Sequence, residues 1–450
     1  MEKMEKIELN KSRIGQLIPV TILILSFYTI MPYLKPEIPL LSFFNNSSLW
    51  WGVSFAILLV FFFSRYRYFD KLDGDNMLVV WIYLFWNLVC IARGLFESEL
   101  KWEWNGGTNN VLALLLPIVV FSATHKMVVQ SLFVYYIRYA LPLFAILALF
   151  ITTDAYGYYL LPVAVLIIFF PAFSRRQSIF ILLLSLLVLL TDLGNRHHIL
   201  VFGLPFLILI IYYLRDRISV RVLEMFRLTL LFVPLLMFLL MSTIRFNDPV
   251  DKSNEINTVT MVKNIGVFDK SILYLEAFKS AINEKNWLLG QTPDRGVESN
   301  ITPAAADAVP VIGSQTGNDM ELSHLFTWTG LMGLMLYYFI FLRATFLAVN
   351  RSNNTYVKMV GIFVAFRWLY AWVEEVNNFT INNFLLMILL GICFSHSFRK
   401  MNNNEMQTWV RGMFDLRFFR PVYPIAERGE LEVKLNANTG STEEKKKIII

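Results

Sequence analysis

The stretch Ile14–Leu34, IGQLIPVTILILSFYTIMPYL, carries no charged residue over a length that can cross a bilayer. A hydrocarbon core about 30 Å thick is spanned by roughly 20 apolar residues in a helix. The stretch Phe226–Thr243, FRLTLLFVPLLMFLLMST, is apolar apart from Arg227 near its start. About twelve such runs follow one another before residue 400, separated by polar segments. The sequence therefore predicts an all-α, polytopic membrane protein.

The predicted spans are residues 14–34, 49–64, 77–96, 109–124, 138–153, 157–174, 178–192, 198–214, 226–243, 325–343, 357–373 and 379–396. We expect residues 1–396 to form a transmembrane domain with one large loop, residues 245–322, on its outer side. Within that loop, apolar residues recur at helical spacing over 269–286, which predicts an amphipathic helix on the outer surface. Residues 397–450 read as a poorly ordered cytoplasmic tail, with one surface helix near 409–419.

Composition supports the membrane class. The 450 residues are 56% hydrophobic and 16% charged, whereas soluble proteins carry about 25% charged residues. The net charge of +6 is scattered over short loops, which argues for an anionic lipid surface as partner and against nucleic acid. Both cysteines, Cys90 and Cys393, lie inside apolar runs, and no Cys/His spacing is typical of a metal site. We expect neither a metal nor another cofactor.

Orientation follows from the basic residues in short loops, which concentrate on the cytoplasmic side of membrane proteins. Alternate loops of this chain are rich in Lys and Arg, and the loops between them are poor. The residues assigned to the cytoplasm are Lys3, Lys6, Lys11, Arg13, Arg65, Arg67, Lys71, Lys126, Arg175, Arg176, Arg215, Arg217, Arg221, Arg227, Arg343, Arg351 and Lys358. Both termini are therefore predicted to be cytoplasmic.

Ionisable residues in or beside a membrane span are functional candidates, and here most of them fall on the predicted outer side. Arginine holds phosphate oxygens bidentately and keeps its proton. The candidates for binding a diphosphate are Arg196, Arg245, Lys270, Arg295 and Arg367. For Arg367 a structural alternative is pairing with Glu374, two turns further along the same face. Arg93 is interpreted as a residue that flanks a helix end.

Proton transfer from a hydroxyl needs a base. Asp319, Glu321 and His324 lie together before the tenth predicted span, and Glu321 and His324 share one helical face through their i, i+3 spacing. His324 could equally be an interfacial histidine without a chemical role. Adjacent His197 and His198 point to different faces of a helix, which makes them a weak metal pair.

The carboxyl-terminal half resembles the O-antigen polymerase and ligase superfamily, integral membrane enzymes that handle sugars linked to undecaprenyl diphosphate. Four short motifs carry the resemblance in order: Thr191–Arg196 (TDLGNR), Thr243–Phe246 (TIRF), Lys270–Ala277 with Trp287–Gly290 (KSILYLEA and WLLG), and Asp319 to Gly333 ending in GLMG. The ligase branch has a His where this chain has Asp319, which favours the polymerase branch. The family's loop arginine falls on Lys270, a point charge without the bidentate fork.

The resemblance implies a GT-C-like membrane fold with a large periplasmic loop. It implies a metal-independent glycosyltransferase of the inner membrane that polymerises lipid-linked repeat units in O-antigen, capsule or exopolysaccharide synthesis. Partners would be the lipid-linked donor and acceptor, a chain-length regulator and a flippase. Two alternatives remain open: a ligase that transfers glycan to lipid A-core, and a polysaccharide or lipid transporter without catalysis.

Overall fold

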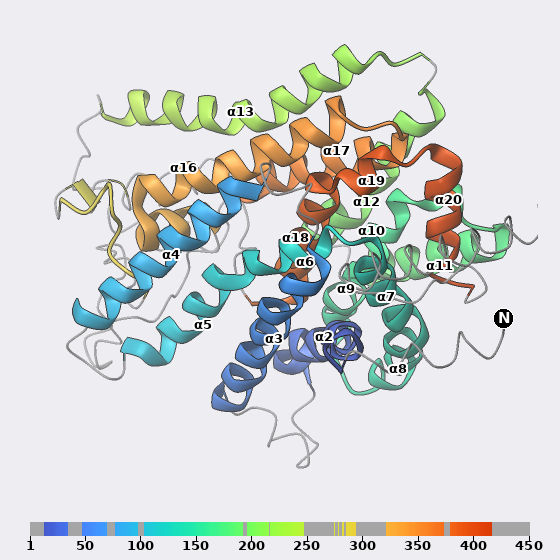
Figure 1. Ribbon diagram of the computed structural model, residues 1–450, viewed down its shortest axis with the longest axis horizontal. Coiled ribbons are helices and arrows are strands. Elements are labelled where there is room, and N and C mark those ends of the chain that lie inside the picture. Colours follow the sequence, from blue (N-terminus) through green and yellow to red (C-terminus); the bar gives the residue numbers. More distant parts are fainter. Residues whose placement is uncertain are drawn as a thin grey trace, which may run out of the picture.

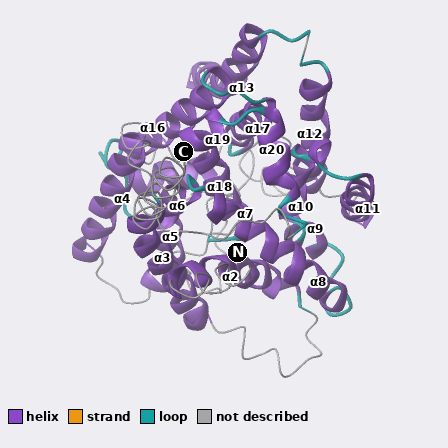
Figure 2. Ribbon diagram, turned by 45° about the vertical axis from the view of Figure 1, so that its right-hand side comes forward, coloured by secondary structure: helices purple, strands orange, loops and turns teal. Residues whose placement is uncertain are grey.

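The computed structural model describes residues 13–34, 47–69, 77–97, 103–191, 196–215, 217–246, 285–293, 321–372 and 379–415, with the single residues 274, 278, 281 and 282. Within these ranges the chain is helical, and the only extended pairing is an isolated bridge between Leu34 and Ile151 (Figure 2). The predicted all-α class agrees with this architecture.

The helices in chain order are α2 (Arg13–Ile30), η1 (Met31–Tyr33), α3 (Ser47–Tyr68), α4 (Leu78–Glu97), α5 (Glu103–Leu115), η4 (Leu116–Ile118), α6 (Val119–Ala123), α7 (Lys126–Tyr135), η5 (Tyr136–Ala140), α8 (Leu141–Leu147), α9 (Ala155–Tyr159), α10 (Leu161–Ile168), η6 (Phe170–Ala172), α11 (Arg175–Thr191), α12 (Arg196–Tyr213), α13 (Val220–Phe246), α16 (Glu321–Asn350), α17 (Thr355–Tyr370), α18 (Ile381–Phe394), α19 (His396–Lys400) and α20 (Asn403–Arg411). Figure 1 shows their arrangement.

Among the described residues, five helices are long and apolar enough to cross a membrane: Gly15–Tyr33, Ser48–Tyr68, Leu78–Phe96, Lys126–Leu147 and Leu322–Asn350. Three shorter apolar helices, Thr108–Ala123, His197–Tyr213 and Ile381–Phe394, also coincide with predicted spans. The structure therefore has the helices of a membrane protein, while twelve crossings stay a prediction.

The exposed face of α4 is what lipid contact requires. Leu78, Ile82, Phe85 and Leu88 recur at threes and fours and are all exposed, whereas Tyr83 on the opposite face is buried. An apolar stripe with this period normally turns toward the core of a soluble protein. On α4 the stripe faces outward, so a hydrocarbon environment explains the sequence better than water does.

The centre of the bundle is formed by α10, α17 and α18, whose apolar side chains are almost all buried. Helix α17 packs against α12, α13, α16 and α18, and α18 packs against α6. These helices bring their residue ranges, which lie far apart in the sequence, into one core.

The fifth predicted span is displaced. The structure has a continuous helical stretch over Lys126–Leu147, interrupted by a π-helical turn at Tyr136–Ala140, in place of a span at 138–153. Gln130 and Ser131 lower the hydropathy of the first half, but both are buried and hydrogen-bonded. Because the Gln130 amide N–H and the Ser131 hydroxyl donate to carbonyl groups inside the protein, the helix begins earlier than hydropathy predicts.

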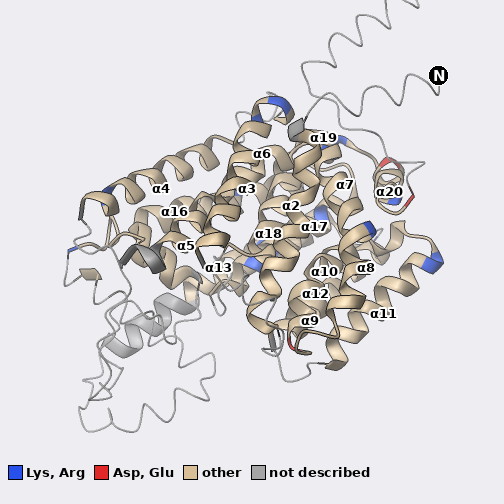
Figure 3. Cartoon of the chain, turned by 90° about the horizontal axis from the view of Figure 1, so that it is seen from below, with Lys and Arg blue, Asp and Glu red and all other residues tan. Residues whose placement is uncertain are grey.

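Contacts between helix termini define two ends of the bundle. At the loop end, the end of α2 meets the start of α18, and the start of α12 meets the end of α17. Described residues between 274 and 293 contact α16 and the end of α17 there. At the tail end, α19 and α20 cover the opposite termini of several helices. Charged residues lie mainly near helix ends, and most of the helical ribbon is uncharged (Figure 3).

Residues 397–415 are part of the packed structure at the tail end, although the sequence assigns them to a poorly ordered tail. Trp409 is buried and donates its indole N–H to the Lys126 carbonyl at 3.1 Å. Helix α20 starts with a capping box in which Asn402 and Glu405 satisfy each other's backbone N–H groups. The asparagine run that looked like a solvated tail is thus a helix start, and α20 spans 403–411 instead of 409–419.

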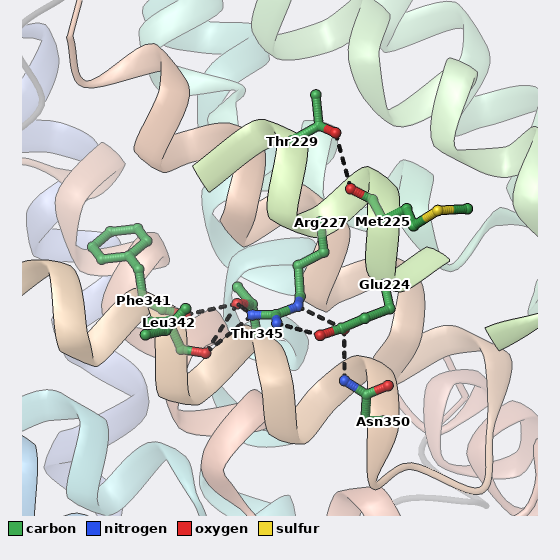
Figure 4. A network of polar contacts seen from close by, with 8 residues as sticks. All are labelled: Glu224, Met225, Arg227, Thr229, Phe341, Leu342, Thr345 and Asn350. Atoms are coloured by element: carbon green, nitrogen blue, oxygen red, sulfur yellow. Dashed lines mark hydrogen bonds and ion pairs between the residues drawn. The ribbon is translucent and has the colours of Figure 1, made fainter. Parts of the chain in front are cut away.

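A polar cluster ties α13 to α16 at the tail end (Figure 4). Arg227 is 2% exposed and forms an ion pair with Glu224, with Nη2 and Oε1 2.5 Å apart. Its Nη1 also donates to the Leu342 carbonyl and to the Thr345 hydroxyl, at 3.2 and 3.1 Å. Asn350 donates to Glu224 at 2.6 Å. The cluster fixes the beginning of α13 against the end of α16.

Candidate functional site

Arg367 is the best-defined candidate at the loop end. It lies in the last turn of α17 and is 3% exposed. Its Nη2 donates to the Asn382 side-chain oxygen of α18 at 3.0 Å, and the guanidinium lies 5.5 Å from the Tyr370 ring centre. Glu374, the partner considered from the sequence, lies outside the described residues. A permanent charge is therefore held at low exposure by an amide from another helix.

His197 joins the same cluster from the start of α12. Its Nδ1 is 2.5 Å from the Tyr370 hydroxyl oxygen, and the two rings are 5.5 Å apart between centres. Tyr158, from α9, contacts the His197 ring at 5.7 Å and stacks on Tyr33 at 5.2 Å. The imidazole is thus fixed between α9 and α17, and its charged neighbour is Arg367.

His198 is a packing residue in this structure. It is fully buried, with its ring 4.8 Å from the Tyr158 ring. A Cβ atom on Gly157 would meet the His198 ring nitrogen Nε2 at a non-bonded distance of only 2.2 Å, so the ring occupies a slot that only glycine leaves open. His197 and His198 therefore have different surroundings, as adjacent residues on a helix should.

Residues 287–291 cross α16 where that helix is broken at Gly330, whose φ and ψ are 67° and −172°. In a continuous helix the Leu331 N–H would bond to the Thr327 carbonyl. Instead Leu331 donates to the Trp287 carbonyl at 2.9 Å, and Gln291 donates to the Thr327 carbonyl at 2.6 Å. The crossing segment thus satisfies both groups that the break leaves without their helical partners.

The crossing is tight because two glycines meet there. Gly290 has φ 77°, and a Cβ on it would lie 2.5 Å from the Gly330 nitrogen; the reverse contact is equally short. The WLLG and GLMG motifs therefore touch in space. Neither motif alone indicated this contact.

Arg93 holds the crossing segment from the end of α4. Its guanidinium donates to the carbonyls of Leu289 and Gly290 at 3.2 and 2.5 Å. Asn110 of α5 donates to the Pro293 carbonyl at 2.9 Å. Arg93 is thus a hydrogen-bond donor to two backbone carbonyls, a role that its position near a helix end did not indicate.

His324 belongs to a different group of contacts. It is 5% exposed in the first turn of α16, and its ring stacks on Trp328 at 5.4 Å. Of the helix predicted over 269–286, the described residues 274, 278, 281 and 282 are helical, whereas residues 285 and 286 are not. Tyr274 donates to the Trp372 carbonyl at 3.1 Å, and Phe278 contacts Phe326. Tyr274 thus contacts the end of α17, and Phe278 contacts the start of α16.

The other predicted site residues are described less fully. Arg196 is the first residue of α12, Arg245 lies near the end of α13 and Glu321 is the first residue of α16, all described by their backbone only. Asp319, Lys270 and Arg295 lie outside the described residues. The contacts above bring Arg367 together with His197 and place His324 with Trp328.

The sequence did not single out Tyr370 or Asn382. Tyr370 is at i+3 from Arg367, and this spacing puts both on one helical face. Asn382 and Asn383 are adjacent amides in an otherwise apolar run, which is a signal in a membrane span. Among the residues with described side chains, no group of three His, Cys, Asp or Glu could hold a metal ion.

Comparison with known proteins finds no matching family model and no curated protein with significant sequence similarity.

Proposed function

We propose that the chain polymerises undecaprenyl-diphosphate-linked oligosaccharide repeat units at the periplasmic face of the inner membrane. The observation that carries the proposal is Arg367, a permanent positive charge that is 3% exposed and shares the Tyr370 ring with His197. The loop end is then periplasmic, because the basic short loops of the sequence fall at the opposite, tail end.

Arg367 would pair with the diphosphate of the donor as its bond to the sugar breaks. A positive group beside a leaving phosphate stabilises the charge that develops in the transition state. Arg196, Arg245, Lys270 and Arg295 are the further proposed phosphate ligands. Asp319, Glu321 and His324 are the proposed bases for the acceptor hydroxyl.

The test is the polysaccharide ladder of a deletion strain complemented with single variants. Arg367→Ala should remove all bands above one repeat, because loss of one charge-stabilising group lowers the rate of transfer roughly 100-fold or more. Arg196→Ala, Arg245→Ala, Asp319→Ala and His324→Ala test the other residues in the same strain. The amount of each variant is measured in isolated membranes.

Arg351→Ala is the matched control, since Arg351 is exposed at the tail end. A wild-type ladder from Arg367→Ala at normal membrane level would refute the proposed site. The deletion strain also separates the alternatives: loss of a polymerase leaves single repeats attached, and loss of a ligase leaves long chains on the carrier lipid. Loss of a transporter leaves lipid-linked single repeats unexported.

A further inference from the structure

We propose that a cavity at the tail end binds a phosphate group, carried either by the headgroup of an anionic lipid or by inorganic phosphate. The cavity has a volume of about 300 Å³ and lies between the end of α12 and the start of α20. Its lining residues are polar: Tyr212, Arg215, Asn402, Asn403, Asn404 and Gln407. The site is separate from the contacts of the loop end, and the proposal does not depend on the polymerase function.

Hydrogen bonds between three helices hold the walls of the cavity in place. Gln407 of α20 donates through Nε2 to the hydroxyl oxygens of Tyr212 in α12 and Tyr356 in α17, at 3.3 and 3.2 Å. The rings of the two tyrosines are 5.3 Å apart between centres. Asn403 is fixed by accepting the Thr355 backbone N–H at 2.8 Å. Because these contacts join separate helices, the cavity is a feature of the fold.

The asparagine amides supply hydrogen-bond donors. The side-chain oxygens of Asn402 and Asn403 accept the backbone N–H groups of Glu405 and Thr355, both at 2.8 Å. A backbone N–H can only donate, so the oxygen is the atom used and each NH₂ group is left to donate. Within the described residues, Asn404 forms a hydrogen bond through its backbone carbonyl and none through its side chain. Ionised phosphate oxygens accept hydrogen bonds, so they match this lining.

The first turn of α20 adds two backbone donors. The capping box satisfies the N–H groups of Asn402 and Glu405. The N–H groups of Asn403 and Asn404 have no acceptor within the helix, as is general for the first turn. The partial positive charge at the start of a helix favours an anion there. An anionic ligand therefore suits these donors better than a neutral one.

Arg215 gives the cavity its positive charge. It is exposed two residues after the end of α12, and its guanidinium lies 4.7 Å from the centre of the Tyr212 ring. Arginine keeps its proton and can hold two phosphate oxygens at once. Glu405 is the acid of the first turn of α20, and its carboxylate accepts the Asn402 N–H at 2.9 Å. Removal of the Glu405 charge should therefore strengthen the binding of an anion and leave that of a neutral ligand unchanged.

The position of the cavity suits a lipid headgroup. Tyr212 lies near the end of the predicted span 198–214, and Arg215 directly follows that span. The phosphates of a bilayer lie just outside its hydrocarbon core, and basic pockets at the cytoplasmic ends of membrane helices bind anionic headgroups. The basic short loops of the sequence predict that the tail end is cytoplasmic.

The experiment uses the purified full-length chain in detergent. Binding of inorganic phosphate is measured by calorimetric titration, and binding of phosphatidylglycerol by native mass spectrometry, with phosphatidylcholine as the reference lipid. The variants are Arg215→Ala, Asn404→Asp and Glu405→Gln, of which the last keeps a residue suited to the capping box. Arg217→Ala is the matched control, because Arg217 is an exposed arginine two residues away that does not line the cavity.

We expect Arg215→Ala to weaken binding about 10-fold or more, because it removes charge-assisted hydrogen bonds. Asn404→Asp should weaken binding about 10-fold as well, because it places a carboxylate beside the anion, although an acid in the first turn favours the helix itself. Glu405→Gln should strengthen binding about two- to fivefold, and Arg217→Ala should stay within about twofold of wild type.

The two probes identify the source of the phosphate. Arg215-dependent binding of phosphatidylglycerol alone assigns a lipid headgroup, and such binding of inorganic phosphate alone assigns the free ion. Binding of both shows that the phosphate group is sufficient. The proposal is overturned if wild-type protein binds neither probe, or if Arg217→Ala weakens binding as much as Arg215→Ala does. If Arg215→Ala does not fold, an unchanged affinity in Asn404→Asp overturns the proposal by itself.

Discussion

Replacement of Gly330 by alanine should detach the crossing segment 287–291 from α16. At φ 67° and ψ −172°, Gly330 occupies a region that is essentially restricted to glycine, and a side chain there costs about 1–3 kcal/mol. The new Cβ would also lie 2.2 Å from the Leu288 carbonyl oxygen and 2.5 Å from the Gly290 nitrogen. Backbone cannot yield as the end of a flexible side chain does, so the segment must move.

The magnitude follows from the bonds that this movement breaks. Leu331 and Met332 donate to the carbonyls of Trp287 and Leu288, and Gln291 donates to the carbonyl of Thr327. Each such bond contributes about 1 kcal/mol net. Together with the backbone strain, Gly330→Ala should lower the free energy of unfolding by about 4 to 6 kcal/mol.

Hydrogen–deuterium exchange of the protein in detergent measures the effect locally. The amides of Leu331 and Met332 should exchange faster in Gly330→Ala, by up to about 100-fold for a loss near 3 kcal/mol. Gly52→Ala is the matched control, because a Cβ at Gly52 meets no atom within 4 Å. Wild-type exchange at both amides, with unchanged thermal stability, would refute the account of the crossing.

Three further predictions concern single side chains. Glu224→Ala should destabilise the protein by about 2 kcal/mol or more in thermal unfolding, because it leaves Arg227 buried without its ion pair. Replacement of both Glu224 and Arg227 by apolar residues should recover part of this loss of stability. A double variant as unstable as Glu224→Ala would contradict the prediction. Arg93→Ala should speed amide exchange in residues 285–293 by removing the donor to two carbonyls, and unchanged exchange there would argue against the clamp. Trp409→Ala should lower the free energy of unfolding by about 3–5 kcal/mol if α20 is part of the core. A loss below about 1 kcal/mol in thermal unfolding would place α20 outside the core.

The positions of most helices could be predicted because apolar runs of membrane length carry a strong, local signal. Helix breaks could not, because they depend on partners elsewhere in the chain. The start at Lys126 depends on Gln130 bonding to the Trp409 carbonyl, almost 280 residues away. The break at Gly330 depends on the segment that contains Gly290.

In the candidate site too, the sequence indicated single residues but not the partners that other helices bring to them. Arg367 was found because a charge in a membrane span is costly and therefore informative. Its partner Asn382 was missed because spacing along a single helix suggests only local partners, and Glu374 was the nearest acid along that helix. His197 was weighed as a metal ligand with His198, whereas its contact with Tyr370 arises only when α12 and α17 pack together.

The interruption of α16 has a consequence for how this chain could be re-engineered. Residues 287–291 complete the hydrogen bonding of a helix that otherwise belongs to the bundle, so deleting them would strand polar backbone in an apolar setting. A chimera that exchanged residues 245–322 with a segment of another protein would have to retain residues 287–291, or bring a replacement that matches the glycine contact.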